Sequence, residues 1–274
     1  MQFAVPIVMG VVNVTPDSFS DGGQFLDPDA AIAHGIELAS QGAAVLDIGG
    51  ESTRPGADPV SEEEELRRVV PVVEGLAGRG GWEVSVDTAK RAVAEGALDA
   101  GAAIVNDVTA FRADSGMAEL VAQRGAGCCL MHMLGEPRTM QDAPRYDDVV
   151  SEVKGFLEER LAFAVDAGVA EEKVWLDPGI GFGKSVEHNL ELLRRLDELV
   201  AIGRPIVVGT SRKSFLGKLA GGRPESGRLP GTIATNVLAL DRGASVFRVH
   251  DVAAVADALT VTAAVLAREG VRQP

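Results

Sequence analysis

The run IVMGVVNV at residues 7–14 is the first of eight short apolar runs that decide the fold of this chain. Each run is too short for a helix and too hydrophobic for a loop, which is typical of a buried parallel strand. The stretches between consecutive runs are long enough for crossover helices, and several show helical periodicity. The pattern therefore predicts an α/β fold, a (β/α)8 TIM barrel that forms a single domain over residues 1–274. The other seven runs are AVLDIGG (44–50), EVSVDT (83–88), AIVNDV (103–108), CCLMHM (128–133), VWLDPG (174–179), PIVVGT (205–210) and VFRVHD (246–251).

Nearly every run carries a polar or charged residue at or just after its end. Parallel strands bring their carboxyl ends to one mouth of a barrel, and that mouth holds the active site. One shared ligand pocket explains eight polar strand ends better than scattered solvation does. The function is therefore to be sought in these residues, which are Asn13, Asp47, Asp87, Asn106, His132, Asp177, Lys213 and Arg248.

Composition narrows the class of ligand. The formal net charge of −14 would repel a nucleic-acid backbone, and an aromatic content of 4% offers few platforms for stacking bases. A small anionic substrate needs only a few local cations, and Arg54, Lys213 and Arg248 lie at predicted strand ends or in the loops after them. We therefore expect a small-molecule substrate and no nucleic-acid partner.

The sequence gives no indication of a membrane segment or of disulfide bonds. MQFAVPIVMG at residues 1–10 has no basic region leading into a long apolar segment, and no run approaches the length of about 18 residues that a spanning helix needs. Cys128 and Cys129 are adjacent in a predicted strand, where they point to opposite faces, so no disulfide between them is expected. We expect a cytoplasmic protein with no membrane partner.

Capping and periodicity place two helices. Ser61 followed by Glu64 fits a capping box at the start of a helix. The acidic run at 62–65 is interpreted as complementing the dipole of this helix. Pro71 should bend or shorten the helix. A second helix is predicted from Asp147 to Ala167, with an apolar stripe packed against the barrel. The segment GGRPESGRLP at 221–230 is predicted to be a mobile surface loop without a chemical role.

The loops after the first two strands are long, polar and specific in composition. They read NVTPDSFSDGG at 13–23 and GGESTRPGADP at 49–59. Such loops offer metal ligands, hydrogen-bond acceptors and a cation at the barrel mouth. Ser, Asp, Gly and Pro are also what ordinary surface turns use, so composition alone leaves both interpretations open. The residues concerned are Asn13, Asp17, Asp21, Thr53 and Arg54.

A series of specific strings follows the predicted strand ends in a fixed order. With them the chain resembles the dihydropteroate synthase family of pterin-binding barrel enzymes over almost its whole length. The resemblance implies that p-aminobenzoate is joined to 6-hydroxymethyl-7,8-dihydropterin pyrophosphate, giving 7,8-dihydropteroate and pyrophosphate in folate biosynthesis. It also implies Mg²⁺ on the pyrophosphate and a homodimer formed through helices near the end of the chain. The strings are NVTPDSFSDGG, DIGGESTRPGA, SVDT, IVNDV, LMHM, LDPGIGFGKS, GTSRKSFLG and FRVHDV.

The pterin ring determines which residue types should bind it. Its amino-pyrimidine edge alternates donors and acceptors, which carboxylates and carboxamides match, so Asp87, Asn106 and Asp177 are expected on that edge. From local sequence alone, Asp87 or Thr88 could equally cap a helix starting near Ala89, and Asp177 could equally be part of a turn. Lys213 is expected to reach the pterin, because a cation near a helix N-terminus is disfavoured by the dipole unless an anionic or acceptor ligand lies nearby.

The resemblance assigns roles to the remaining candidate residues. Asp87, Asp177 and Lys213 are implied to be catalytic. Arg248 and His250 are implied to bind the pyrophosphate, together with Mg²⁺. Asn13 is implied to be the metal ligand, and Met131 and Phe182 to form apolar walls. Thr53, Arg54 and Ser214 are implied to bind p-aminobenzoate. Thr15 and Asp21 are implied to complete the site around the cation.

The expected reaction is a dissociative displacement that needs no protein nucleophile. Pyrophosphate leaves first, the dihydropterin delocalises the positive charge on its methylene group, and the aromatic amine then attacks.

Three other functions remain open: a Schiff-base aldolase using Lys213, a methyltransferase between a reduced folate and a corrinoid, and a non-catalytic pterin-binding paralogue. GFGKS at 181–185 lacks the leading glycine of a phosphate-binding loop, since Pro178 stands there, and the histidine spacing does not predict structural zinc.

Overall fold

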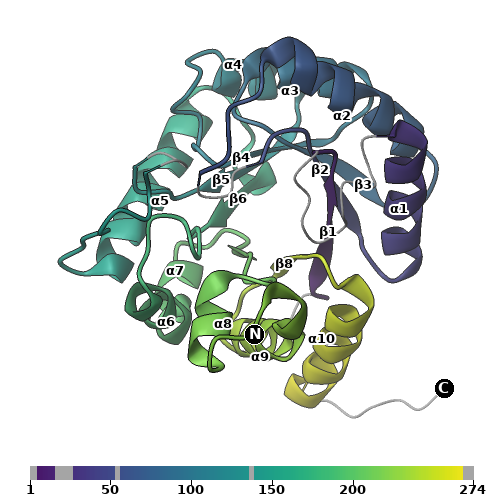
Figure 1. The fold of residues 1–274 in the computed structure, drawn as a ribbon. Coiled ribbons are helices and arrows are strands. Elements are labelled where there is room, and N and C mark those ends of the chain that lie inside the picture. The colour runs from purple at the N-terminus through teal and green to yellow at the C-terminus, as the bar shows by residue number, and fades with distance from the viewer. Residues whose placement is uncertain (1–4, 16–26, 53–55, 136–138, 268–274) are drawn as a thin grey trace.

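A computed structural model describes residues 5–15, 27–52, 56–135 and 139–267 of this chain. In this part of the chain, eight parallel strands form one sheet in the order β6-β5-β4-β3-β2-β1-β8-β7. Helices surround the sheet on its outer side (Figure 1). The predicted single-domain (β/α)8 barrel is confirmed. The strands are β1 (Ile7–Asn13), β2 (Val45–Gly49), β3 (Glu83–Asp87), β4 (Ile104–Asp107), β5 (Gly127–Met131), β6 (Val174–Asp177), β7 (Val207–Val208) and β8 (Val246–Val249).

The helices follow the strands along the chain, with extra short helices around β6 and β7. Two of these extra elements are 3-10 turns, Glu171–Lys173 and Glu225–Gly227. The α-helices within the described residues are α1 (Pro28–Ser40), α2 (Glu62–Leu76), α3 (Arg91–Asp99), α4 (Met117–Arg124), α5 (Val149–Asp166), α6 (Val186–Arg194), α7 (Leu196–Val200), α8 (Ser214–Leu219), α9 (Leu229–Asp241) and α10 (Val252–Leu266).

The barrel closes between β6 and β7 through few hydrogen bonds. β7 has only two residues, and a parallel bridge between Leu176 and Ile206 connects it to β6. The N–H of Leu176 donates to the carbonyl of Pro205 over 3.0 Å. The other seven neighbouring strand pairs have continuous parallel registers.

The interior of the barrel has an apolar floor below a polar layer. The floor is formed by buried side chains from alternate strand positions, which pack as one cluster. Inward-facing positions recur every second residue along a strand, so the next inward position lies two residues further on. On several of these strands that position holds a polar residue. Asp47, Asn106, Asp177 and Arg248 occupy such positions. The buried residues of the floor are Met9, Val45, Ile104, Cys129, Val207 and Val246.

The first predicted helix start is confirmed, but only one half of the predicted capping box forms, because the Glu64 carboxylate binds Arg67 and Arg68 instead. Pro71 does not shorten the helix. Ser61 precedes α2, and its hydroxyl accepts from the N–H of Glu64 over 3.3 Å. The helix nevertheless continues through Pro71 to Leu76. Pro71 has no N–H to donate to the carbonyl of Arg67, four residues earlier in the helix. Both residues lie on the solvent-exposed side of α2, so water can solvate that carbonyl.

The acidic run at the start of α2 has a second role that the dipole interpretation missed. Glu65 is fully buried, and its carboxylate forms an ion pair with Lys90. The same ammonium also pairs with Glu51, in the loop after β2. Glu51 in turn accepts from the N–H of Val60 over 3.2 Å, so this network fixes where the loop after β2 begins and ends.

The other structural predictions have mixed outcomes. The long helix predicted at 147–167 is α5, and its N-cap is Asp148. Cys128 and Cys129 are buried free thiols, as expected. The segment 221–230 is not simply a loop, because it contains a 3-10 turn and the start of α9. Among the described residues, no helix has the length and apolarity needed to cross a membrane. A cytoplasmic location stays a prediction.

Candidate active site

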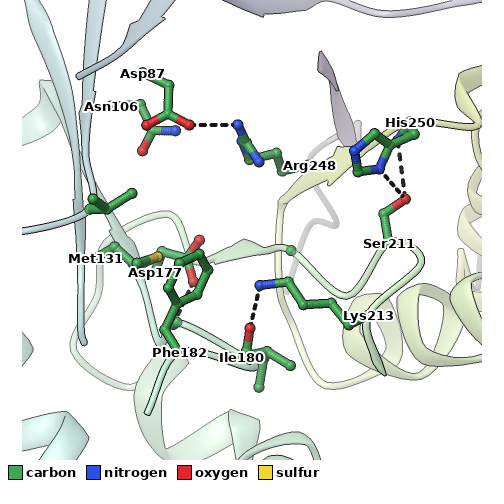
Figure 2. Close-up of a pocket in the computed structure, with 13 residues that line it drawn as sticks. Asp87, Asn106, Met131, Asp177, Ile180, Phe182, Ser211, Lys213, Arg248 and His250 are labelled. Carbon is green, nitrogen blue, oxygen red and sulfur yellow. Dashed lines mark hydrogen bonds and ion pairs between the residues drawn. The ribbon is translucent and has the colours of Figure 1, made fainter. Parts of the chain in front are cut away.

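Two adjoining cavities open at the carboxyl ends of the strands. The outer cavity has a volume of about 530 Å³, and Asn13, Thr15 and Ser214 line it. The deeper one contains most of the predicted pterin residues (Figure 2). Six of the eight polar strand ends therefore line one site, as the sequence predicted, whereas Asp47 and His132 line neither cavity. The predicted residues in the deeper cavity are Asp87, Asn106, Met131, Asp177, Phe182, Lys213, Arg248 and His250.

Three predicted residues cannot be placed. Thr53, Arg54 and Asp21 lie outside the described residues, as does Asp17. Their roles at the mouth of the barrel stay predictions.

Arg248 on β8 connects three strands at the barrel mouth. Its Nε donates to Oδ2 of Asp47 on β2, and its Nη2 donates to Oδ2 of Asp87 on β3, each over 2.7 Å. Asn106 on β4 donates from Nδ2 to the same Asp47 oxygen over 3.0 Å. Burial opposes the charge on the guanidinium, but the two carboxylates outweigh it and raise the pKa of Arg248. Arg248 therefore stays charged inside the site.

Asp87 contacts Arg248 and does not cap a helix. Helix α3 starts at Arg91, and the side chain that accepts a hydrogen bond just before it is Thr88, from the N–H of Lys90 over 3.2 Å. Burial raises the pKa of Asp87 to about 7, because loss of solvation and the nearby Asp47 together outweigh the attraction of Arg248. The capping interpretation of Asp87 was therefore wrong.

Asp177 belongs both to a turn and to the site. Its Oδ1 accepts from the N–H of Gly179 over 2.6 Å, so the turn interpretation is confirmed for that oxygen. The residue also lines the deeper cavity. Burial raises the pKa of Asp177. Gly179 has a φ of 66°, and a Cβ there would lie 1.9 Å from the carbonyl oxygen of His132, so only glycine fits.

Lys213 points into the deeper cavity from the loop after β7. Its Nζ donates to the carbonyl of Ile180 over 2.5 Å and lies 4.0 Å from the centre of the Phe182 ring (Figure 2). Lys213 is the residue just before α8, and its side chain does not cap that helix. Burial lowers the pKa of Lys213 to about 7, against the attraction of Asp177.

Ser211 and His250 form the end of the site nearest to α10. The Ser211 hydroxyl contacts the backbone N–H of His250 over 3.1 Å and its Nδ1 over 3.0 Å (Figure 2). Both residues line both cavities, together with Arg248. Sequence analysis did not select Ser211, although it lies in the string SRKS that contains Lys213.

Sequence analysis also missed a buried lysine behind the site. The ammonium of Lys184 lies 3.0 Å from His132 Nδ1 and donates to the carbonyl of Phe182 over 3.0 Å. Burial lowers the pKa of Lys184 to about 7 and that of His132 to about 3. Uncharged His132 accepts the hydrogen bond, so the pair fixes the loop that carries Phe182. Lys184 lies in the string GFGKS, which the sequence analysis used both as a test for a phosphate-binding motif and as part of the resemblance, but neither use assigned a role to this lysine.

Comparisons with known proteins place this chain among pterin-binding enzymes. Residues 9–250 match the family model described as "Pterin binding enzyme". Dihydropteroate synthase of Escherichia coli K12 is 48% identical over 266 residues, which cover 97% of this chain and 94% of that protein.

Two solved structures from Xanthomonas albilineans are also similar. Its dihydropteroate synthase with 4-aminobenzoic acid superposes with a TM-score of 0.90 at 50% identity, covering 97% of this chain and 95% of that one. The complex with 7,8-dihydropteroate gives a TM-score of 0.86 at 46% identity, covering 98% and 97%.

Replacing Lys213 should change how stability depends on pH. The folded pKa is about 7, whereas an unfolded lysine has a pKa of about 10.4. The unfolded chain thus binds more protons between these values, and wild-type stability should rise relative to Lys213→Met as the pH increases across them. Urea unfolding of both proteins at about pH 6.5 and about pH 9.5 measures this change. A stability difference that is constant with pH would contradict a lowered pKa of Lys213 in the folded protein.

Proposed function

The chain belongs to the dihydropteroate synthase family of pterin-binding enzymes, and we propose that it joins p-aminobenzoate to 6-hydroxymethyl-7,8-dihydropterin pyrophosphate. The products are 7,8-dihydropteroate and pyrophosphate. The observation that carries this proposal is the convergence of Asn106, Asp177 and Lys213 in one buried cavity. Complexes of a similar synthase with 4-aminobenzoic acid and with 7,8-dihydropteroate support p-aminobenzoate as a substrate and 7,8-dihydropteroate as the product.

The pterin binds in the deeper cavity. The amino-pyrimidine edge of the pterin carries N–H donors that need acceptors, and an oxygen and ring nitrogens that need donors. Asp177 supplies acceptors, Lys213 supplies donors, and the carboxamide of Asn106 can supply both. Met131 and Phe182 provide apolar walls on the same cavity. Buried polar groups that lack a partner cost about 1–3 kcal/mol each, so a ligand of complementary pattern is favoured over one without it.

The chemical step is a displacement at the methylene carbon of the pterin. The C–O bond breaks and its electron pair leaves with pyrophosphate, while the electron-rich dihydropterin ring spreads the resulting positive charge. The carboxylates of Asp87 and Asp177 stabilise that charge from a buried position, where electrostatic interactions are stronger than in water. The amine of p-aminobenzoate then forms the C–N bond and loses one proton to the released pyrophosphate or to water.

The two remaining substrate groups bind nearer the mouth. Ser211 and His250 are adjacent to Arg248 at the end where the pyrophosphate would lie, and Arg248 adds positive charge there. Ser214 is exposed at the outer cavity, where it would contact p-aminobenzoate beside Phe182. Thr15 borders the same cavity. Thr53 and Arg54 would also bind p-aminobenzoate, and Asp21 would complete the site around the cation.

The other functions have less support. An aldolase would use Lys213 as its nucleophile, and trapping of a substrate adduct with borohydride would reveal it. A corrinoid methyltransferase has no use for p-aminobenzoate, which a similar synthase binds. A non-catalytic paralogue would be expected to lack site residues, yet all of those that the structure describes are present.

We propose that Mg²⁺ binds through Asn13 together with the pyrophosphate. Gly49 leaves space between two oxygens, since a Cβ there would lie 3.8 Å from Asn13 Oδ1 and 3.9 Å from Asp87 Oδ2. Oxygen donors suit Mg²⁺, which usually takes one or two protein oxygens plus phosphate oxygens and water. Within the described residues no three His, Cys, Asp or Glu side chains form a metal cluster. When bound, Mg²⁺ would neutralise charge on the leaving group.

The reaction assay uses Asp177→Asn against wild type. Wild-type protein should release pyrophosphate and form 7,8-dihydropteroate only when p-aminobenzoate is present. Asp177→Asn should lower kcat/KM by roughly 10²-fold, because a charged acceptor on the pterin is lost. Asp197→Asn, at an exposed ion pair with Arg242, is the matched control and should keep wild-type kinetics. Full activity of Asp177→Asn would show that the pterin lies elsewhere.

The metal proposal is tested by binding, without turnover. Isothermal titration with pyrophosphate should show binding that Mg²⁺ strengthens at least roughly tenfold in wild type, and Asn13→Ala should lose most of that gain. Pyrophosphate that binds equally well in Mg²⁺ and in EDTA would contradict the proposal.

We also propose a homodimer through α9 and α10, which pack against each other. Val261 and Val265 lie one turn apart on α10 and are 65% and 77% exposed, and Leu238 on α9 is 39% exposed. A Val261→Asp, Val265→Asp double variant should sediment as a monomer, because two charges cannot be buried unpaired. Val165→Asp on α5 is the control and should remain dimeric. A monomeric wild type would refute this interface.

A further inference from the structure

Arg212 lies between two residues of the site and has an unusual backbone. Its φ is 57°, in the left-handed region that side chains with a Cβ disfavour. Ser211 before it contacts His250, and Lys213 after it contacts Ile180 (Figure 2). A glycine would adopt this conformation without strain, so an arginine here has to be held by its surroundings.

Contacts of three kinds hold Arg212 in place. The guanidinium forms a bidentate ion pair with Asp251, with Nε–Oδ2 and Nη2–Oδ1 distances of 2.9 and 2.6 Å. The backbone N–H donates to the hydroxyl of Thr232, a fully buried residue of α9, over 3.0 Å. The carbonyl accepts from Nη1 of Arg228 over 2.8 Å. The side chain and both backbone polar groups of Arg212 are thus fixed at once.

These contacts connect the loop after β7 to the loop after β8 at two consecutive positions. Ser211 is hydrogen-bonded to His250, and Arg212 is ion-paired with Asp251, the next residue along. Asp251 precedes α10 but makes no side-chain cap there, so its carboxylate is used for Arg212. The two loops therefore behave as one unit at the edge of the site.

We propose that Arg212 is a positioning residue, whose ion pair with Asp251 holds the left-handed backbone that directs Ser211 and Lys213 into the site. Rotation of φ out of the left-handed region turns the chain on either side of residue 212. Ser211 and Lys213 cannot both keep their partners after such a rotation. This role deepens the proposed function and rests on it, since the site that Arg212 organises is the one assigned to pterin and pyrophosphate.

The experiment compares Arg212→Ala, Arg212→Gly and Asp251→Asn with wild type. Arg212→Ala loses the ion pair and keeps the Cβ, so the loop should relax and kcat should fall by roughly tenfold or more. Arg212→Gly also loses the ion pair but tolerates a positive φ, so its kcat should lie between those of Arg212→Ala and wild type. Asp251→Asn should reduce kcat in the same direction. The effects should fall on kcat more than on KM for p-aminobenzoate.

A matched control removes another bidentate arginine pair far from the site. Arg195→Ala loses the contacts of Arg195 with Glu198 and Asp148, and it should keep wild-type kcat. Equal kcat values for Arg212→Ala and wild type would overturn the inference. Equal losses in Arg212→Ala and Arg212→Gly would also overturn it, because the guanidinium alone would then matter.

Crystal structures of the two Arg212 variants give a readout that does not depend on activity. In Arg212→Ala, residue 212 should leave the left-handed region, and Lys213 Nζ should no longer contact the carbonyl of Ile180. In Arg212→Gly, both features should persist. An unchanged Lys213 in Arg212→Ala would overturn the inference. A wild type that makes no 7,8-dihydropteroate would refute the proposed function instead, and the structures would still decide the role of Arg212.

Discussion

The ion pairs of Arg248 with Asp47 and Asp87 are the interaction on which the site depends. They join β8, β2 and β3 inside the barrel mouth, each over 2.7 Å. A buried charge without its partner is strongly destabilising, by about 3–5 kcal/mol in measured cases, so the three side chains hold one another in place. The carboxamide of Asn106 is attached to the same cluster through Asp47. The contacts of the polar layer are therefore already formed without a ligand, which is the condition for electrostatic catalysis.

The apolar floor and the loops complete this arrangement from two sides. Buried side chains such as Met9, Cys129 and Val246 fill the barrel below the polar layer and keep water out of it. Above the layer, Lys184 holds the loop that carries Phe182. Burial on both sides explains why the pKa of Lys213 falls to about 7 while that of Asp177 rises. A cation forming on a bound pterin would face carboxylates in a place with little competing water.

The sequence was sufficient for the barrel and for most of the residues of the site. Short apolar runs and polar strand ends are local properties, so they predicted the eight strands and placed Asp177 and Lys213 at the mouth of the barrel. The ion pair between Arg248 and Asp47 was not predictable, because the two residues are 201 positions apart and come together only where β8 and β2 both pair with β1. The backbone of Arg212 was equally hidden, since a positive φ is expected at glycine.

The most direct test of this account is a crystal structure of the protein with 7,8-dihydropteroate bound. The amino-pyrimidine edge should contact Asn106 and Asp177 in the deeper cavity, with Lys213 within hydrogen-bond distance of the pterin. Arg248 should keep both of its carboxylate partners in the complex. A pterin bound outside this cavity, or an Arg248 that releases Asp47 to bind it, would contradict the central claim that a preformed ion cluster organises the site.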